Sequence, residues 1–324
     1  MEFEFAKESI IELDIYVDEI EPEDDCNFIT LGALFIPCNK KDNLLVQLLN
    51  IRCQNEGNKH WNTSYEDCPN KANCRRDWHD MNNCEIHFSD IRDGRVNRSL
   101  INISKSWLNT FCKGKEIFIN VLCVDLNKLD KSFFGNDTTN VNIYNKFFRT
   151  LINYGIKSFF SIYTRVQIRD IYYDEKNELE RHYFFNTKNL DKISYESSEK
   201  ITFSNRILFI NSDHRVKGTS PNNAQFIQFI DLIIGSIRHN IFMTSQSQKK
   251  SEVARNIRSQ LNKLRANYYD SKILRISFFP KNKIKQMTDL NNEKTYYRND
   301  AYYYLDAFRF VMPEQNNTLE AYLR

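Results

Sequence analysis

Glycine is scarce in this chain of 324 residues, and its spacing excludes several common motifs. There are only 8 glycines, and the two nearest in sequence, Gly218 and Gly235, are seventeen positions apart. The Walker loop, the Rossmann fingerprint and the nucleophile elbow each need glycines within about six residues of one another. The chain therefore contains none of these three motifs.

The chain also lacks a long apolar run and a basic N-terminal segment. No stretch approaches the roughly 18 consecutive apolar residues of a membrane-spanning helix. The first residues are MEFEFAKESIIELD, which is acidic where a secretory or mitochondrial signal would be basic. We therefore expect a cytoplasmic protein with no membrane partner. Its eight cysteines are then expected to be reduced thiols or metal ligands instead of a disulfide framework.

The formal net charge of only +3 hides one acidic and one basic region. Residues 1–25 contain eleven acidic residues and a single lysine, whereas residues 245–285 contain eleven basic residues and two acidic ones. This asymmetry is typical of proteins that bind cations or polyanions. Hydrophobic residues make up 41% of the chain and charged residues 27%, as in ordinary globular proteins, so we expect it to fold.

Apolar and amphipathic segments alternate along the chain and predict an α/β fold. Strands are expected at 11–17, 28–36, 116–124, 161–173 and 206–211, and helices at 42–52, 99–111, 144–157 and 225–242. Strands that alternate with helices indicate a mixed sheet flanked by helices. The polar stretch 244–250 has no periodicity, so we expect a boundary there between a domain at 1–243 and an extension at 244–324.

Four of the predicted strands run into acidic residues. These acids are Asp18 and Glu19, Asp125, Asp174 and Glu175, and Asp213. Ligands of open α/β sheets bind beyond the carboxyl ends of strands, where these side chains would project. A single aspartate after a strand is more often a turn former or a helix cap, and Asp174 precedes Lys176 and Asn177, which favour a turn.

A further acid, Asp231, falls on the edge of the apolar face of the predicted helix 225–242. An unpaired charge there would be costly, and a divalent cation can hold several carboxylates together. Oxygen ligands favour Mg²⁺ or Mn²⁺, and two such ions can activate water and stabilise the leaving oxygen of a phosphodiester. The acids therefore predict a metal-dependent nuclease. A salt bridge between Asp231 and Arg238 is the alternative.

The order of several short motifs carries a resemblance to a known family. The segments are 16–19 (YVDE), 28–35, 85–91 (EIHFSDI), 212–213 (SD) and 228–235 (QFIDLIIG). In this order they resemble the bacterial and phage proteins of the domain of unknown function 3800 family, over roughly residues 11–243. The resemblance implies a ribonuclease H-like fold, a mixed sheet flanked by helices, and cleavage of nucleic acid with two metal ions.

The resemblance also implies residue roles. Metal ligands would be Asp18, Asp125, Asp213 and Asp231, while Glu19 and Glu85 would coordinate metal or position water. Two positions depart from the family pattern: Ile20 follows Glu19 where Ser is usual, and Ile230 stands where Ala usually precedes the late Asp. Members from bacteria and phage imply a setting in anti-phage defence. The alternative function is a catalytically inactive nucleic-acid-binding or sensor subunit that acts with a partner protein.

Residues 53–84 show neither helix nor strand periodicity and contain many potential zinc ligands. They contain Cys53, His60, Cys68, Cys74, His79 and Cys84. So many thiols and imidazoles in a polar stretch indicate a small insertion stabilised by Zn²⁺, which needs four ligands. The expected set is Cys53, His60, Cys68 and Cys74, with His79 and Cys84 as substitutes. Because the stretch has no Cys-x-x-Cys knuckle, reduced thiols on a surface loop remain the alternative.

The C-terminal region combines basic and aromatic segments. A predicted helix at 252–267 has an apolar stripe and a basic face. The side chains expected to bind nucleic-acid phosphates are Lys249, Lys250, Arg255, Arg258 and Arg265. A solvated helix face is the alternative. The aromatic residues of 296–310 are expected to lie in a core or subunit interface, with base stacking as the alternative.

Overall fold

The computed structural model of the chain describes residues 9–23, 26–53, 64–68, 71–72, 74–94, 98–127, 129, 140–175, 187–204, 207–266, 273–279, 285–289 and 294–298. Every structural statement below concerns these residues. His60 and the aromatic residues from Tyr302 onward, which entered the sequence predictions, lie outside them, as does the side chain of Arg265.

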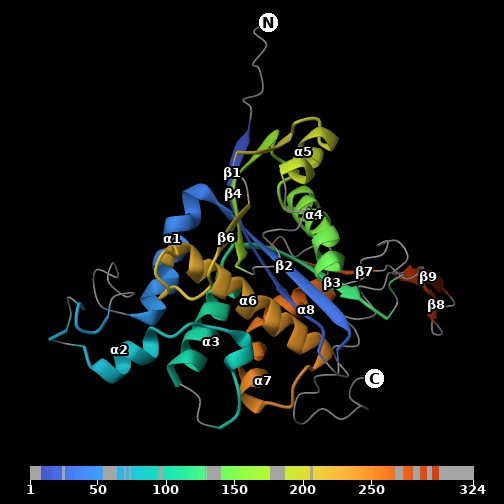
Figure 1. The fold of residues 1–324 in the computed structure, drawn as a ribbon. Coiled ribbons are helices and arrows are strands. Elements are labelled where there is room, and N and C mark those ends of the chain that lie inside the picture. The colour runs from blue at the N-terminus through green and yellow to red at the C-terminus, as the bar shows by residue number, and fades with distance from the viewer. Residues whose placement is uncertain are drawn as a thin grey trace, which may run out of the picture.

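Seven strands form one mixed sheet (Figure 1). They are β1 (Ile10–Ile20), β2 (Phe28–Pro37), β3 (Phe118–Asp125), β4 (Arg165–Asp174), β5 (Ile201–Phe203), β6 (Ile207–Ile210) and β7 (Leu274–Phe279). The order is β5-β4-β1-β2-β3-β7, and β6 pairs with β4 further along the same edge as β5. Only β2 runs antiparallel to its neighbours in this sheet; every other pairing is parallel. The predicted α/β fold with a mixed sheet is confirmed. Outside it, β8 (Lys285–Asp289) and β9 (Lys294–Arg298) form a two-stranded pair.

The central strand β2 is apolar along nearly its whole length because both faces of the sheet are covered. Every residue from Ile29 to Pro37 is buried. Strands covered on both sides read as continuous hydrophobic runs instead of alternating ones. One face packs against α4 (Asn140–Phe159) and α5 (Thr187–Glu196).

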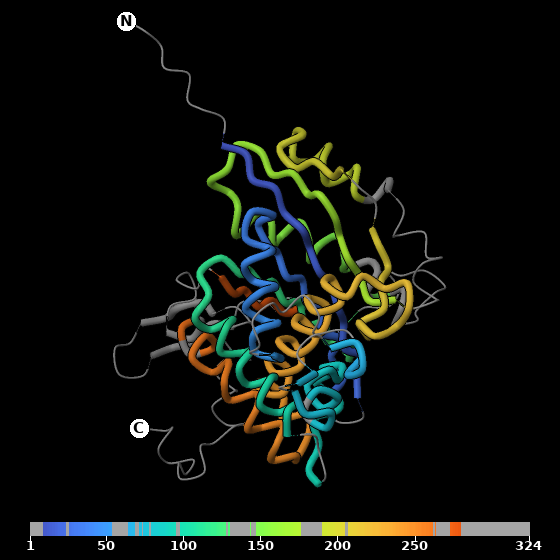
Figure 2. Tube along the Cα trace, turned by 90° about the vertical axis from the view of Figure 1, so that its left-hand side faces the viewer, coloured from blue at the N-terminus to red at the C-terminus, as the bar shows by residue number. Residues whose placement is uncertain are grey.

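The opposite face carries the larger group of helices (Figures 1 and 2). They are α1 (Cys38–Arg52), α3 (Arg98–Lys113), α6 (Pro221–Phe242), α7 (Gln248–Ala254) and α8 (Arg258–Ala266). A short helix, α2 (Arg76–Asn82), and the 3-10 turns η2 (Phe88–Asp90) and η5 (Arg255–Ile257) complete the described elements. The single helix predicted at 252–267 is therefore divided among α7, η5 and α8.

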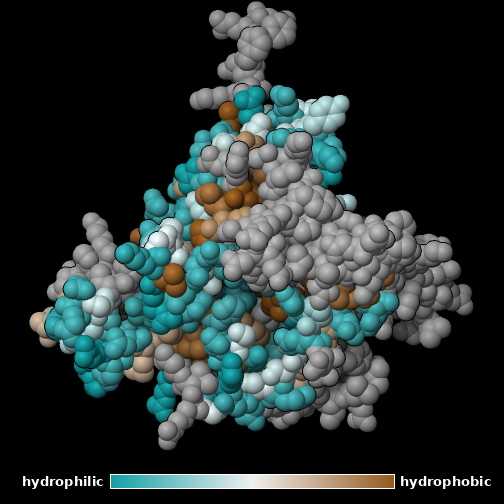
Figure 3. All heavy atoms as spheres, in the orientation of Figure 1, coloured by the Kyte–Doolittle hydropathy of each residue, from teal (hydrophilic) through white to brown (hydrophobic). Residues whose placement is uncertain are grey.

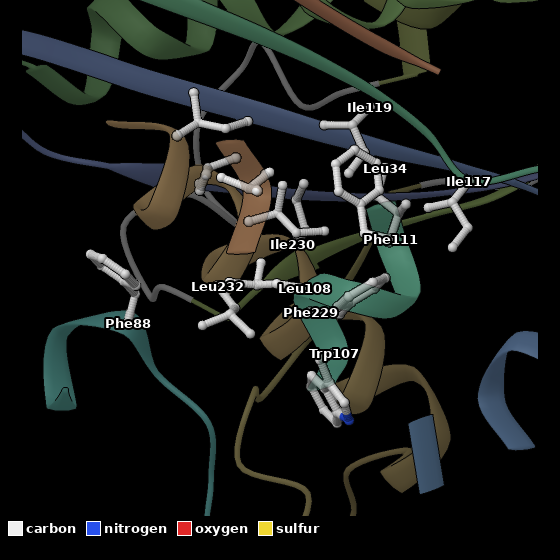
Figure 4. Close-up of a cluster of buried hydrophobic side chains, with 14 of the residues drawn as sticks. Leu34, Phe88, Trp107, Leu108, Phe111, Ile117, Ile119, Phe229, Ile230 and Leu232 are labelled. Carbon is white, nitrogen blue, oxygen red and sulfur yellow. The ribbon is translucent and has the colours of Figure 1, made fainter. Parts of the chain in front are cut away.

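Helix α6 runs through the middle of this layer. Every residue from Ala224 to Ile241 is buried, because the helix lies on β1 and β2 and is itself covered by α1, α3 and α7. Figure 4 shows Phe229 beside Trp107 of α3, and the two rings meet edge to face with centroids 5.8 Å apart. The close approach to the sheet depends on Gly32 of β2, where a Cβ atom would lie 2.2 Å from Ile234 Cγ2.

Residues beyond the expected boundary at 244 belong to the same core. Strand β7 pairs with β3 at the edge of the sheet. Val253, Ile257 and Ile276 are buried in one cluster with the apolar residues of α6 and α3. In Figure 2 the orange C-terminal helices lie directly against α3. The change of composition at 244 is thus not a break in packing.

The face in Figure 3 is mainly hydrophilic, with apolar patches between the polar side chains. Within the described part of the chain, none of the helices has both the length and the apolar character needed to cross a bilayer.

Candidate functional site

Carboxylates from β1, β4 and α6 converge at one end of the sheet. Val17 of β1 pairs with Tyr173 of the parallel strand β4, so Asp18 and Asp174 follow at the same end. Asp231 approaches from α6, and Asp18 and Asp231 are only 5% and 6% exposed. Burial, followed by the nearby Asp231, Glu19 and Asp174, raises the pKa of Asp18 well above its usual value. Carboxyl groups are thus held together in a site that disfavours their charged form.

Backbone amides hold two of these carboxylates in place. The Glu19 N–H donates to Asp18 Oδ1 at 2.9 Å. Asp174 Oδ1 accepts from the N–H groups of Glu175 and Ser212, both at 3.1 Å. The second bond fastens the end of β4 to the segment that follows β6. Asp174 faces the acidic cluster, while the expected turn at 176–177 lies outside the described residues.

Asp231 binds the chain at the start of η2, through His87 and Phe88. Its Oδ2 accepts a hydrogen bond of 2.7 Å from the Phe88 N–H and lies 3.2 Å from His87 Nδ1. The hydrogen bond with Asp231 and the charge of that carboxylate raise the pKa of His87 to about 10. The imidazole is therefore protonated at neutral pH and places one positive charge beside the carboxylates.

Gln228, one helical turn before Asp231, binds the same segment. Its Oε1 accepts from the Ile86 N–H at 3.0 Å, and its Nε2 donates to the Ser212 carbonyl at 2.6 Å. The Ser212 hydroxyl in turn donates to Glu85 Oε1 at 2.9 Å. Gln228 and Asp231, one turn apart on α6, thus bind the alternate backbone amides of Ile86 and Phe88. These two bonds hold Glu85 and His87 next to the cluster.

A buried arginine supports this arrangement from α1. Arg52 donates to Gln228 Oε1 and Gln225 Oε1, each at 2.6 Å, and to the carbonyls of Asn82 and Cys84 at 3.0 and 2.7 Å. Its guanidinium also lies over the Trp107 ring, 4.9 Å from the centroid. Burial lowers the pKa of Arg52 to about 10, which still leaves it charged at neutral pH.

Of the other two predicted metal ligands, Asp125 is distant from Asp18 and Asp213 is paired with an arginine. Asp125 ends β3 opposite Phe28 of β2, whereas Asp18 is opposite Gly32. Asp125 is therefore displaced from Asp18 by four residues along the strands, roughly 13 Å, and by two strands across the sheet, about 10 Å. Asp213 pairs instead with Arg215, whose Nε lies 2.8 Å from Asp213 Oδ1, and this hydrogen bond lowers the pKa of Asp213. Sequence position alone does not distinguish these acids from those that converge.

Three of the six predicted catalytic acids are therefore brought to this end of the sheet on the α6 side, namely Asp18, Glu85 and Asp231. Glu19 is opposite Leu31 on β2 and so points to the α4 face of the sheet, away from Asp231. The structure adds Asp174 and His87. Asp174 carried the signal of a strand ending in an acid, but its turn-forming neighbours favoured the other interpretation. The alternative of an Asp231 salt bridge with Arg238 is not what the structure shows, because Arg238 donates to the carbonyls of Glu21 and Cys26 at 2.7 and 3.4 Å.

The predicted basic face borders the site at one point. Lys250 Nζ lies 5.6 Å from the centre of the Phe88 ring, next to His87. Lys249 donates to the Gly94 carbonyl at 2.7 Å, while Arg258 donates to Asn240 Oδ1 at 3.4 Å and Arg255 is exposed. Among the predicted phosphate-binding side chains that the structure describes, Lys250 thus contacts the segment that carries His87.

Comparison with known proteins finds no match to a protein-family model, a curated protein or a solved structure.

In the described ranges, the one group of three thiol, imidazole or carboxylate ligands with all ligand atoms within 4.8 Å of one another is Cys68, Cys74 and His79. The carboxylates of the cluster are more widely spaced. Hard oxygen donors suit Mg²⁺ or Mn²⁺, and a pair of ions about 3.5–4 Å apart needs its ligands spread around both. The donor chemistry of Asp18, Asp174 and Asp231 therefore fits such ions.

Proposed function

We propose that this protein is a metal-dependent nuclease that hydrolyses phosphodiester bonds of DNA or RNA. The observation that carries the proposal is the convergence of Asp18, Asp174 and Asp231 from three separate elements at one end of the sheet. Burying like charges together is unfavourable unless a cation or a proton compensates them. Mg²⁺ or Mn²⁺ would supply that charge, activate water and stabilise the leaving oxygen.

The proposed fold is ribonuclease H-like. Support comes from the antiparallel meander β1-β2-β3, extended by the parallel strands β4 and β6, with acids at the ends of β1 and β4 and on the late helix α6. This proposal also follows the resemblance to the domain of unknown function 3800 family.

Each residue of the site has a proposed task. Asp18, Asp174 and Asp231 would hold the metal, and no side chain needs to act as a covalent nucleophile. Glu85, oriented by the Ser212 hydroxyl, positions water. Protonated His87 and Lys250 attract the phosphate of the substrate.

A second candidate is a non-cleaving nucleic-acid-binding or sensor subunit. It is favoured by the pairing of His87 with Asp231, which partly neutralises the cluster without any metal. Manganese affinity separates the two candidates. A nuclease site binds Mn²⁺ and loses affinity in Asp231→Asn, whereas a degenerate site binds it weakly and is insensitive to that change.

The direct test is cleavage of labelled single-stranded and double-stranded DNA, RNA and hybrid duplexes by the purified protein with Mn²⁺. We expect Asp18→Asn, Asp174→Asn and Asp231→Asn each to lower the rate roughly 100-fold, because each removes several kcal/mol of charge stabilisation. Asp125→Asn is the matched control, since it makes the same change at the end of β3, two strands from β1, and should leave the rate unchanged. No cleavage of any substrate, or equal damage from Asp125→Asn, would overturn the proposal.

A further inference from the structure

A second cluster of metal-ligating side chains lies outside the carboxylate site. Cys68 follows a turn at 66–67, Cys74 lies two residues before α2 and His79 lies within α2, and their ligand atoms are all within 4.8 Å of one another. Cys74 Sγ is 3.8 Å from His79 Nδ1. Tetrahedral zinc, with bonds of about 2.3 Å to sulfur and about 2.0 Å to nitrogen, separates such a pair of ligand atoms by about 3.6 Å. The cluster therefore already has the dimensions of a zinc site.

Cys53, at the end of α1, is the candidate for the fourth zinc ligand. Cys53 caps the C-terminus of α1 directly after Arg52, which donates to the carbonyl of Asn82 at the end of α2 at 3.0 Å. The Cys53 thiol lies outside the group within 4.8 Å, so it would have to move closer to complete the site. Cys84 is surrounded differently, because its charged neighbours are Arg52, Arg215 and Asp90 instead of the other thiols. The geometry thus selects Cys68, Cys74 and His79, and Cys53 is the thiol that we assign to complete the set.

Tyr65 contacts two members of the cluster, and the third observation is the burial of His79. The Tyr65 hydroxyl donates to the Cys74 carbonyl at 3.0 Å, and the Tyr65 ring meets His79 edge to face with centroids 5.9 Å apart. His79 is only 8% exposed although it lies in a polar part of the chain. None of the eight cysteines forms a disulfide. Nearby thiols and a buried imidazole in a segment with few apolar residues favour metal over packing as the stabilising force.

We propose that Cys53, Cys68, Cys74 and His79 bind one structural zinc ion that fastens α2 to the end of α1. Thiolate and imidazole ligands select Zn²⁺ over Mg²⁺ or Mn²⁺, so this site is distinct from the carboxylate cluster in chemistry as well as in position. Four protein ligands leave no open coordination position, which makes the role structural.

The position of the ion suggests what it stabilises. Cys53 directly follows Arg52, and Arg52 donates to the carbonyl of Asn82, the last residue of α2. Zinc and Arg52 together fix both ends of α2, and the chain leaving α2 carries Glu85 and His87 to the carboxylates. This consequence rests on the proposed nuclease function, whereas the zinc site itself does not.

Metal analysis of the full-length protein tests the site without any activity assay. We expect about one zinc per chain in the wild type, loss of zinc in Cys74→Ser, and retention in Cys112→Ser. The control makes the same substitution at Cys112, a partly buried thiol on α3. Its Sγ lies 3.1 Å from the Asn256 carbonyl oxygen, so its contact is with η5 and not with the cluster. Absence of zinc from the wild type, or equal zinc in Cys74→Ser, would overturn the proposal.

Cobalt substitution keeps the test independent of whether Cys74→Ser folds. Co²⁺ bound to the wild-type chain should give thiolate-to-cobalt absorption, and Cys53→Ser should weaken that absorption because one of three thiolates is lost. An unchanged band in Cys53→Ser would overturn the four-ligand assignment. Mass analysis that finds Cys68 and Cys74 joined by a disulfide in the purified protein would overturn the zinc site altogether.

Discussion

Asp14 and Asp18 lie four residues apart on the same face of β1, yet their surroundings shift their ionisation in opposite directions. Burial alone would raise the pKa of Asp14, but hydrogen bonds from Arg169 and Lys41 outweigh it and lower the pKa. Burial raises the pKa of Asp18 too, and its neighbours are mainly carboxylates where those of Asp14 are cations, so they add to the rise instead of offsetting it. Residue type and strand position are shared, and only the partners distinguish a structural aspartate from a candidate metal ligand.

Replacing Asp14 tests the structural half of this contrast. Its side chain is fully buried, with Lys41 Nζ at 2.7 Å and Arg169 Nη2 at 2.6 Å. We expect Asp14→Asn to lower the free energy of unfolding by about 3 kcal/mol at pH 7, since it leaves the partly buried Lys41 without its counter-charge. Urea unfolding measures this loss.

The pH dependence of that loss follows from the direction of the shift. Because the folded pKa of Asp14 is below its unfolded value, its stabilising effect is fully present above about pH 4 and disappears as the pH falls through the folded pKa. The difference between wild type and Asp14→Asn should therefore shrink at low pH. Glu196→Gln, which breaks the exposed pair with Arg149, is the control and should have little effect at any pH. A difference that is constant with pH would contradict this account.

At the scale of elements, the contact between α6 and residues 84–88 organises the site. Two side chains one turn apart, Gln228 and Asp231, accept from the amides of Ile86 and Phe88. Gly235, one turn further along, leaves room for the Phe88 ring, because a Cβ atom there would lie 2.4 Å from Phe88 Cγ. The helix therefore presents two acceptors and one gap that together fit a single extended segment.

Gly235→Ala should disturb the site through this gap. The clash is with the root of the Phe88 ring, which cannot move away without its backbone, so the Phe88 N–H should leave Asp231. We expect a loss of about 1–3 kcal/mol in stability from overpacking and weaker Mn²⁺ binding by titration. Ser236→Ala, on the adjacent and equally buried position, adds no volume and should leave Mn²⁺ affinity unchanged. Normal Mn²⁺ binding by Gly235→Ala would show that the segment tolerates the displacement.

The predicted elements were accessible from the sequence because they depend on local periodicity. Strands β1 to β4 and helices α1, α3, α4 and α6 all occur where apolar residues recur at strand or helix spacing. The membership of the site was less accessible. Asp125 and Asp174 both end strands, and only the pairing of β4 with β1 places Asp174 beside Asp18. The role of His79 likewise depends on α2, which has no strong apolar period to reveal it.

At the scale of the whole molecule, the chain returns to its first sheet after leaving it. Strand β7 lies parallel to β3, although about 150 residues separate them in sequence. The basic composition from 245 onward concealed this return, because the buried side chains of α7, η5 and β7 are spaced among charged ones. A composition change marks a change of surface, whereas the core depends on which apolar residues are buried together.

Ile276→Ala tests whether this C-terminal part folds as one unit with the sheet. Ile276 of β7 is 1% exposed and pairs with Val121 of β3, so its truncation should cost about 2–5 kcal/mol. We expect one urea transition by circular dichroism, shifted as a whole to lower denaturant. Ile162→Ala, the same substitution at a position that is 81% exposed, should leave the midpoint in place. If Ile276→Ala instead shifted only a separate minor transition, residues beyond 244 would unfold independently, and β7 would be an addition to the sheet instead of part of its stability.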